Sequence, residues 1–316
     1  MREEEKIGDI LKLKKEKDAI ILGHFYQIPQ IQDISDFVGD SLLLAQKAKE
    51  AKNKVILFCG VHFMGETAKI LNPDKKVIIP DMEAGCSLAD SCPEDKFIEF
   101  KKQNPDHLVI SYINCSAKIK ALSDIICTSG NALKIVESLP KDQKIIFAPD
   151  KNLGGYINRL TGRNMLLWDG SCEVHQLLTS EEVLKQKIKN PDAILIAHPE
   201  CNDAVLQIAD FVGSTSEMIS FVNKDNKHNK FLVATETGIV HKLQKDNPEK
   251  TFIVVTNDSS CSCNDCRYMK LNTIDKVLSS LREEKYEILL DEALIEKAKK
   301  PIERMLSLSK ELKILK

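Results

Sequence analysis

The segment AIILGHFYQ, residues 19–27, decides the fold that we predict for this chain of 316 residues. It is a run of Ile and Leu, typical of a buried strand, that ends on the polar side chains of His24 and Tyr26. The segments HLVISYINC, 107–115, and AILIAHPEC, 193–201, follow the same plan. Short apolar runs that alternate with helix-like stretches are typical of β-α-β units around a parallel sheet. The sequence therefore predicts an α/β protein built from three pseudo-symmetric, three-layer αβα units.

Each of these three segments ends on a pair of polar residues two positions apart. Tyr112 follows His24 by 88 residues, and His198 follows Tyr112 by 86. Because a strand alternates faces with a period of two, both members of a pair point to the same side. The pairs are His24 with Tyr26, Tyr112 with Asn114, and His198 with Glu200. Such strand ends are the natural place for an active site in an α/β protein.

Further runs support the repeated plan. One set, each a strand followed by a turn and an amphipathic helix, comprises residues 55–71, 124–139 and 209–222. A second set carries a polar residue near each strand exit, namely Asp81, Asp150 and Asn257. The run 230–243 fits neither set, and we interpret it as an extra run within the third unit.

Three cysteines recur with a similar spacing. Cys172 follows Cys86 by 86 residues, and Cys266 follows Cys172 by 94. One cysteine per unit suggests three thiolates that meet at a pseudo-axis, with chance spacing as the alternative. The predicted domains are 1–86, 87–172 and 173–266, with the C-terminal segment 267–316 packing back on the first.

Composition excludes several kinds of partner. The chain has 45 Lys and Arg against 47 Asp and Glu, a net charge of −2, so no overall field attracts nucleic acid or an anionic membrane. Its acidic start, MREEEK, lacks a secretory signal, and no window approaches the ~20 apolar residues of a membrane span. We therefore expect a cytoplasmic protein with no nucleic-acid or membrane partner.

Ten cysteines are many for a cytoplasmic chain. Because cytosolic thiols stay reduced, they indicate metal binding, catalysis or burial. Cys59 and Cys127 lie in apolar runs, and we predict that they are buried. Cys261, Cys263 and Cys266 form C-x-C-x-x-C, and C-x-x-C is half of many zinc sites.

The wide separation of Cys86, Cys172 and Cys266 favours a central iron–sulfur site over a local zinc site. A 4Fe-4S cluster normally takes four cysteine ligands. With only three, one iron stays open to bind a substrate as a Lewis acid.

Segments along nearly the whole chain resemble quinolinate synthases, enzymes of NAD biosynthesis. They come in family order and include ILGHFYQIPQIQDISDFVGDSLLLA at 21–45, CGVHFMGETAKILNPDKKVIIPDMEAGCSLAD at 59–90, WDGSCEVH at 168–175 and CRYMKLN at 266–272. The resemblance implies three α/β domains around one 4Fe-4S cluster, with iminoaspartate and dihydroxyacetone phosphate as substrates. It implies that Cys86, Cys172 and Cys266 are the ligands. The role of Cys261 and Cys263 stays open, as does coupling to an aspartate-oxidising enzyme.

Both of these substrates are anionic, yet the predicted site contains no obvious Arg or Lys. Helix N-termini can replace them, because their free N–H groups and dipole hold anions. Hydroxyl groups mark three such turns: Ser41, Ser129, and Ser214 with Thr215. Helix capping is the alternative role for each hydroxyl. Similarity to the family's binding residues favours substrate contacts.

The strand-end pairs would supply the proton chemistry of ring formation. We expect Glu200 to be the general base. Tyr26, His24 and His198 would donate to carbonyl or carboxylate oxygens, and Tyr112 and Asn114 would orient them. Other histidines, His175 among them, are interpreted as structural. By alternation Phe25 should face away from the site, so its identity should matter little.

Two other functions stay open on the sequence. One is a different 4Fe-4S-dependent hydro-lyase that acts on a dicarboxylate and needs no phosphate pocket. The other is an iron or redox sensor whose cluster only stabilises the fold. A sensor needs no acid–base groups at strand ends, which argues against the second.

Overall fold

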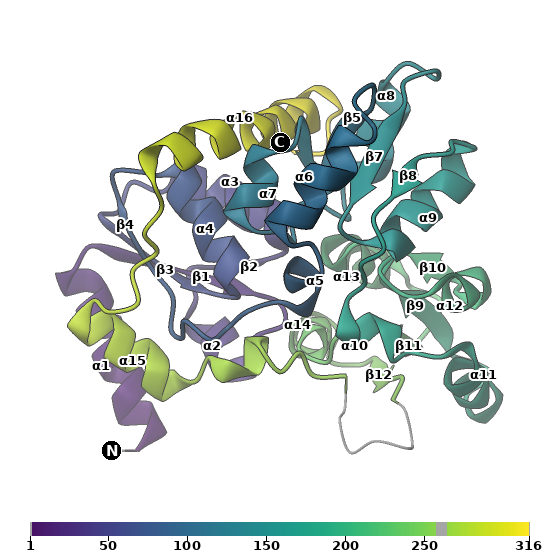
Figure 1. Ribbon diagram of the computed structural model, residues 1–316. Helices are drawn as coiled ribbons and strands as arrows, with labels where there is room; N and C mark the ends of the chain where they lie inside the picture. Colours follow the sequence, from purple (N-terminus) through teal and green to yellow (C-terminus); the bar gives the residue numbers. More distant parts are fainter. Residues whose placement is uncertain (1, 257–263, 316) are drawn as a thin grey trace.

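A computed structural model describes residues 2–256 and 264–315 (Figure 1). Its strands form three four-stranded sheets in which all pairs of neighbouring strands are parallel. Each sheet has the same order, with the unit's first strand between its second and third, and its fourth strand at one edge. The predicted α/β class with three similar units is confirmed. Asn257, Cys261 and Cys263 lie outside the described residues.

The first sheet, β2-β1-β3-β4, contains β1 (Ala19–His24), β2 (Phe37–Gly39), β3 (Val55–Cys59) and β4 (Lys76–Ile78). The second, β6-β5-β7-β8, contains β5 (Leu108–Tyr112), β6 (Ile125–Cys127), β7 (Ile145–Ala148) and β8 (Leu166–Leu167). The third, β10-β9-β11-β12, contains β9 (Ile194–Ala197), β10 (Phe211–Val212), β11 (Lys230–Ala234) and β12 (Thr251–Val254).

Helices cover both faces of each sheet. The first unit has α1 (Glu3–Glu16), α2 (Pro29–Ile34), α3 (Ser41–Glu50) and α4 (His62–Leu71). The second has α5 (Ser87–Asp90), α6 (Glu94–Lys102), α7 (Ala117–Ala121), α8 (Ala132–Ser138) and α9 (Lys151–Thr161). The third has α10 (Glu173–Gln176), α11 (Ser180–Lys189), α12 (Asp203–Ile208), α13 (Thr215–Lys224) and α14 (Ile239–Asp246). Within the described ranges no helix is long and apolar enough to cross a bilayer.

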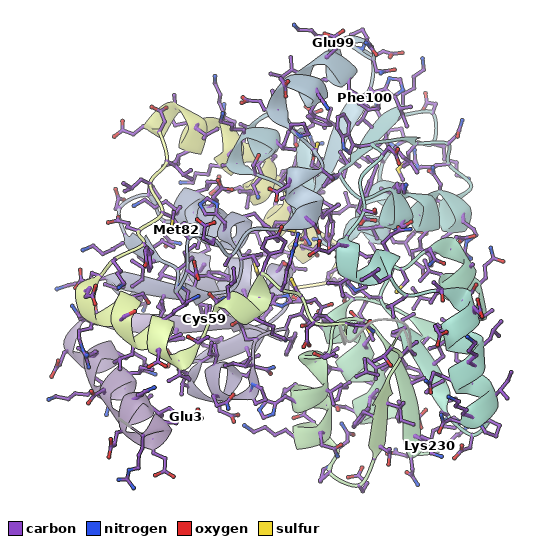
Figure 2. All side chains as sticks on the ribbon, turned by 60° about the horizontal axis from the view of Figure 1, so that its bottom comes forward. Glu3, Cys59, Met82, Glu99, Phe100 and Lys230 are labelled. Atoms are coloured by element: carbon purple, nitrogen blue, oxygen red, sulfur yellow. The ribbon has the colours of Figure 1, made fainter. Side chains whose placement is uncertain are left out.

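The central strands are continuous apolar runs because helices bury them on both sides. All six residues of β1 and all five of β3 are buried. The predictions for Cys59 and Cys127 are confirmed, since neither has exposed surface. Cys59 lies inside the molecule, whereas Glu3 and Glu99 lie at its periphery (Figure 2).

One aspartate in each unit ties the first strand to the loop before the short edge strand. Its Oδ2 accepts the N–H of the strand residue 15 positions earlier, at 2.7–2.8 Å. The pairs are Asp36 with Ile21, Asp124 with Val109, and Asp210 with Leu195. These aspartates are 88 and 86 residues apart, as are the strand-end polar residues. The three units therefore share their hydrogen bonding as well as their topology.

The strand order corrects the grouping of the predicted runs. Residues 55–71 form β3 and α4, which correspond to β7 and β11, not to the runs 124–139 and 209–222. The true partner of those two runs is β2 with α3. The search for apolar runs did not detect it, because β2 has only three residues, lies at a sheet edge and is partly exposed. The run 230–243 is no addition, since it forms β11 and α14, the regular third strand and its helix.

The C-terminal segment continues through η1 (Met269–Leu271), α15 (Ile274–Glu283) and α16 (Glu292–Glu311). Helix α15 packs on α1 of the first unit. Helix α16 packs mainly on α7 and β6 of the second unit and also on α4 of the first (Figure 1). Its buried residues Ile302 and Met305 belong to an apolar core shared by these two units. The segment therefore contacts both.

Phe25 connects the first unit to the third. It faces away from the strand-end side chains, as alternation predicts, but only 5% of its surface is exposed. Its ring lies in the third unit's core, with Met218, Val222 and Phe231. The expectation that its identity matters little is therefore wrong, because a face turned from the site can still be an interface.

Phe25→Ala should lower the free energy of unfolding by about 3–5 kcal/mol, the usual cost of removing a buried phenyl ring. Urea denaturation measures the change. Phe37→Ala, at a ring that is 39% exposed, is the control and should cost much less. Equal losses in the two variants would show that Phe25 does not join the units.

Candidate active site

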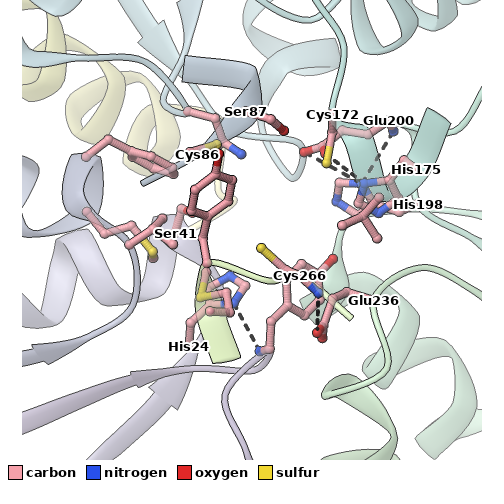
Figure 3. Close-up of a pocket in the computed structure, with 18 of the residues that line it drawn as sticks. His24, Ser41, Cys86, Ser87, Cys172, His175, His198, Glu200, Glu236 and Cys266 are labelled. Atoms are coloured by element: carbon pink, nitrogen blue, oxygen red, sulfur yellow. Dashed lines mark hydrogen bonds and ion pairs between the residues drawn. The ribbon is translucent and has the colours of Figure 1, made fainter. Parts of the chain in front are cut away.

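Residues from all three units and from the C-terminal segment line one cavity (Figure 3). The predicted site residues on its wall are His24, Tyr26, Ser41, Cys86, Tyr112, Asn114, Ser129, Cys172, His198, Glu200, Thr215 and Cys266. Ser214 is not on the wall. Its hydroxyl accepts the N–H of Glu217 at 3.3 Å, and the Glu217 carboxylate accepts the N–H of Ser214 at 2.8 Å. This capping box agrees with the alternative interpretation of Ser214 as a helix cap.

Three thiols face the cavity from three different loops. Cys86 and Cys172 are the N-cap residues of α5 and α10, and Cys266 precedes η1. Burial raises the pKa of all three, for Cys266 to about 11, and repulsion from the other sulfurs adds to the rise for Cys86 and Cys172. A cation bound between them would remove that repulsion.

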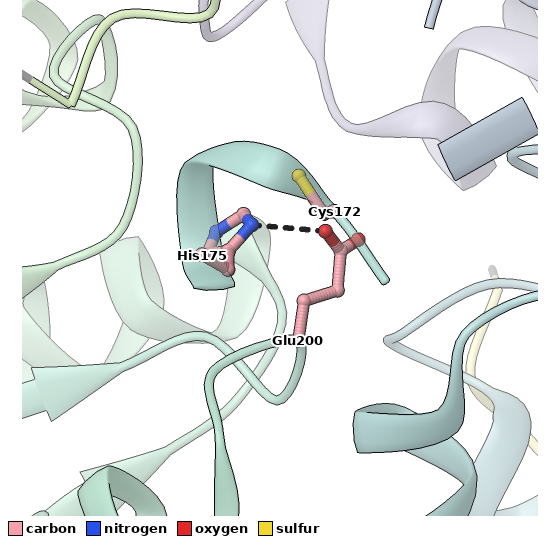
Figure 4. A group of neighbouring side chains, drawn as sticks. All are labelled: Cys172, His175 and Glu200. Atoms are coloured by element: carbon pink, nitrogen blue, oxygen red, sulfur yellow. Dashed lines mark ion pairs between the residues drawn. The ribbon is translucent and has the colours of Figure 1, made fainter. Parts of the chain in front are cut away.

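Glu200 lies at the centre of the polar wall. Its Oε1 accepts the hydroxyl of Tyr112, and its Oε2 is 2.9 Å from Nδ1 of His175. The His198 ring stacks on His175 at 4.9 Å between ring centres. Ligand atoms of Cys172, His175 and Glu200 all lie within 4.8 Å of one another (Figure 4). A thiol and an acid–base pair thus meet at one point.

Glu200 is buried, and burial alone would raise its pKa. The His175 and His198 imidazoles and the Tyr112 hydroxyl oppose this effect and hold the pKa at about 2. The buried negative charge in turn raises the pKa of Tyr112 and Tyr26, beyond the effect of their own burial. The ionised Glu200 therefore lies near two phenols that stay neutral.

His175 and Thr235 complete a chain that sequence reasoning missed. The Thr235 hydroxyl lies 2.9 Å from Nε2 of His175 and 2.8 Å from the Tyr26 hydroxyl. A series of close contacts therefore runs from Tyr112 through Glu200, His175 and Thr235 to Tyr26, and of these the contact of His175 Nδ1 with Glu200 lies outside hydrogen-bond geometry. Thr235 directly follows β11, so correct placement of the run 230–243 would have drawn attention to it.

His24 and His198 share one geometry on the first and third units. In each, Nδ1 accepts the backbone N–H two residues later, of Tyr26 at 3.1 Å and of Glu200 at 3.3 Å. A neutral ring that accepts at Nδ1 carries its proton on Nε2. In His198 this Nε2 lies 3.2 Å from the Ser129 hydroxyl.

The hydroxyl-bearing turns also reach the wall. Ser41 and Thr215 are the first residues of α3 and α13, whose caps are Asp40 and Ser214. Asn114 Oδ1 is buried and has no hydrogen-bond partner within the described part of the chain. An unpaired buried amide oxygen costs free energy, which a ligand that donates to it would recover.

None of the described wall residues is Arg or Lys, as the sequence led us to expect. Two cations close to wall residues are paired with acids. Lys270 Nζ lies 2.6 Å from Glu236, a wall residue that sequence reasoning missed. Arg267, at the exposed rim, lies 3.0 Å from Glu173.

Known proteins resemble this chain along nearly its whole length. The family model described as Quinolinate synthetase A protein matches residues 8–307. The chain is 56% identical over 303 residues to the quinolinate synthase of Synechocystis sp., covering 96% of this chain and 95% of that protein. The chain belongs to the quinolinate synthase family. Identity is 54% with the Chloroherpeton thalassium and 52% with the Cyanophora paradoxa quinolinate synthase, over 96% of this chain and 94% and 92% of those proteins.

Membership of the quinolinate synthase family implies a 4Fe-4S cluster, and the pocket fits one. Its three cysteine thiols are free of disulfides and project toward a common space (Figure 3). Sulfur donors of this kind are the normal ligands of iron–sulfur clusters.

The buried imidazoles make stability depend on pH. Burial, with repulsion from His198, lowers the pKa of His24 from 6.5 to about 3. As the pH falls below about 6.5, His24 is protonated in the unfolded chain but stays neutral in the folded chain. The free energy of unfolding therefore decreases as the pH falls from 6.5 toward 3. Between pH 7 and 5, His24 should account for a loss of about 2 kcal/mol.

His24→Gln should remove this contribution, so its free energy of unfolding should fall less between pH 7 and 5 than that of the wild type. Urea denaturation of the cluster-free chain at the two pH values measures both falls. Parallel falls would mean that His24 is not buried in its neutral form.

Proposed function

We propose that this pocket condenses iminoaspartate with dihydroxyacetone phosphate to give quinolinate, phosphate and water. One observation carries the proposal: three thiols, a buried carboxylate and several neutral proton donors, drawn from three units, surround one cavity. The close similarity to quinolinate synthases supports the same reaction.

In this proposal Cys86, Cys172 and Cys266 hold one 4Fe-4S cluster. With three protein ligands, the bound cluster supplies an open iron that acts as a Lewis acid toward a substrate oxygen or nitrogen. Such thiolates need a reducing compartment, which supports a cytoplasmic location.

Neutral hydrogen-bond donors, instead of cationic side chains, would bind the substrate anions. The hydroxyls of Ser41, Ser129 and Thr215 would donate to phosphate or carboxylate oxygens, together with the backbone N–H groups at the starts of α3 and α13. His24 and His198 would donate from Nε2 to carbonyl or carboxylate oxygens. The Asn114 amide and the Tyr112 hydroxyl would orient the substrate.

Glu200 would take protons, because it is a buried and ionised carboxylate on the cavity wall. Tyr26 would act at the other end of the chain through Thr235 and His175. A proton that Glu200 takes from the substrate can return along these residues, so that Tyr26 donates its own hydroxyl proton to a substrate oxygen, receives another from Thr235 and stays neutral. This suits a phenol whose pKa is raised by burial and by Glu200.

The need for a supply of iminoaspartate adds a partner enzyme to the proposal. Iminoaspartate hydrolyses in water, so an enzyme that oxidises aspartate would have to produce it close in time and space. We propose this functional coupling on the chemistry of the substrate alone.

Replacing Cys86, Cys172 or Cys266 by Ser should abolish or strongly reduce both cluster content and quinolinate formation. Iron and sulfide analysis of anaerobically reconstituted protein measures the first, and product formation from the two substrates the second. Cys59→Ala, at a buried cysteine within β3, is the control and should keep the cluster. Loss of iron in Cys263→Ser combined with its retention in Cys266→Ser would refute the ligand assignment.

Glu200→Gln keeps the shape of the side chain but removes the base, so kcat should fall by ~100- to 10,000-fold with the cluster intact. Ser129→Ala and Thr215→Ala should instead cost about 1.5–3 kcal/mol each, largely as weaker substrate binding. Steady-state kinetics on cluster-loaded protein separates the two effects. Near-wild-type kcat in Glu200→Gln would pass the base role to Tyr26 or a histidine.

A further inference from the structure

Glu236 carries a buried charge that the proposed chemistry does not use. The residue has no exposed surface and lies on the cavity wall two positions after β11. Its Oε1 accepts the backbone N–H of Cys266 at 3.1 Å and lies 2.6 Å from Lys270 Nζ. Its Oε2 accepts the N–H of Gly238 at 2.6 Å. Both carboxylate oxygens are therefore committed to donors.

Lys270 extends this contact to the first unit. The ammonium that pairs with Glu236 also donates to the backbone carbonyl of Tyr26 at 2.7 Å. One carboxylate thus joins three segments that are distant in sequence: the end of β11, the segment that carries Cys266, and the loop that carries Tyr26. Figure 3 shows the carboxylate of Glu236 beside the backbone of Cys266, below the sulfur.

The loop that carries Tyr26 has no room to move toward the third unit. A Cβ added to Gly238 would lie 2.7 Å from backbone atoms of Tyr26. Nε2 of the buried Gln32 lies 2.9 Å from each of the carbonyl oxygens of Phe25, Gln27 and Gly238, and its two hydrogens are shared among them. The two loops are therefore also bound to each other by contacts that do not involve Lys270.

If its only role were packing, a buried ion pair in this position would cost desolvation free energy without need. Apolar residues of similar volume often stabilise a buried site as well as a salt bridge does, because two charges lose their hydration. The carboxylate instead provides directional contacts, because it holds a backbone N–H, an ammonium group and two loops in fixed positions relative to one another.

We propose that Glu236 is a positioning residue that fixes Cys266 and, through Lys270, Tyr26 in one arrangement around the cavity. The inference rests on the proposed roles of Cys266 as a ligand and Tyr26 as a proton donor. Glu236 itself neither transfers a proton nor contacts iron. Gln cannot replace it, because whichever way the amide turns, its NH2 group meets the N–H of Gly238 or the donors of Cys266 and Lys270.

The test uses full-length protein reconstituted anaerobically with its cluster. Glu236→Gln should release iron to a chelator about 10- to 100-fold faster than wild type, the factor expected when a hydrogen bond to a charged group is lost. The electron paramagnetic resonance spectrum of its reduced cluster should also change. Lys270→Met keeps the acceptor for Cys266, so it should hold its iron, while kcat falls about tenfold at an unchanged KM.

Asp210 offers a matched control in the same unit. It also accepts one backbone N–H, from Leu195 at 2.8 Å, and pairs with one lysine, Lys187, at 2.9 Å, but it lies outside the cavity wall. Asp210→Asn should lower stability alone, with wild-type iron release, spectrum and kcat.

Wild-type iron release and spectrum in folded Glu236→Gln would overturn the proposal, as would equal changes in Asp210→Asn. If Glu236→Gln failed to fold, wild-type kcat in Lys270→Met would still overturn it. Failure of the proposed function looks different: the wild-type chain would then take up no cluster or form no quinolinate, whatever residue stood at 236.

Discussion

Parallel pairing of the strands is the constraint on which the rest of the structure depends. In a parallel sheet the carboxyl ends of all strands lie at the same edge. In each unit the residues that follow the first strand, which is β1, β5 or β9, therefore emerge at that edge. The aspartates Asp36, Asp124 and Asp210 fix the same loop against the first strand of every unit. Three such edges directed at one place create a cavity whose wall no single unit could build.

The cavity places charged groups where water cannot solvate them. Glu200 is tolerated because Tyr112 and His175 contact its two oxygens, and Glu236 because Lys270 and two backbone N–H groups do so. Apart from the N–H of Gly238, these partners come from segments distant in sequence from the carboxylate that they contact. Burial of a carboxylate therefore requires the units to be assembled, and the chemistry of the site is tied to their docking.

The sequence could predict what repeats or alternates locally. Strand-end pairs such as His24 with Tyr26, the spacing of Cys86 and Cys172, and the burial of Cys59 all follow from patterns within a few residues or from a shared period. The edge strand β2 could not be found, because three residues, one of them exposed and one partly exposed, have no distinctive pattern. The contacts of Glu236 with Cys266 and Lys270, and the burial of Phe25 in a neighbouring core, join distant segments, on which local patterns carry no information. Thr235 was missed because the run 230–243 was interpreted as an addition to the third unit.

The units are alike in their framework and different where they face the cavity. The aspartate contact keeps one form in all three, whereas the first strand-end residue is His, Tyr or His, and the second is Tyr, Asn or Glu. A threefold-symmetric wall would present the same group to every part of a ligand. Two unlike substrates that must exchange protons need an acid at one point and a base at another. Tyr26 and Glu200 occupy equivalent positions on the first and third units, so divergence at one position of a repeated frame is enough to separate these roles.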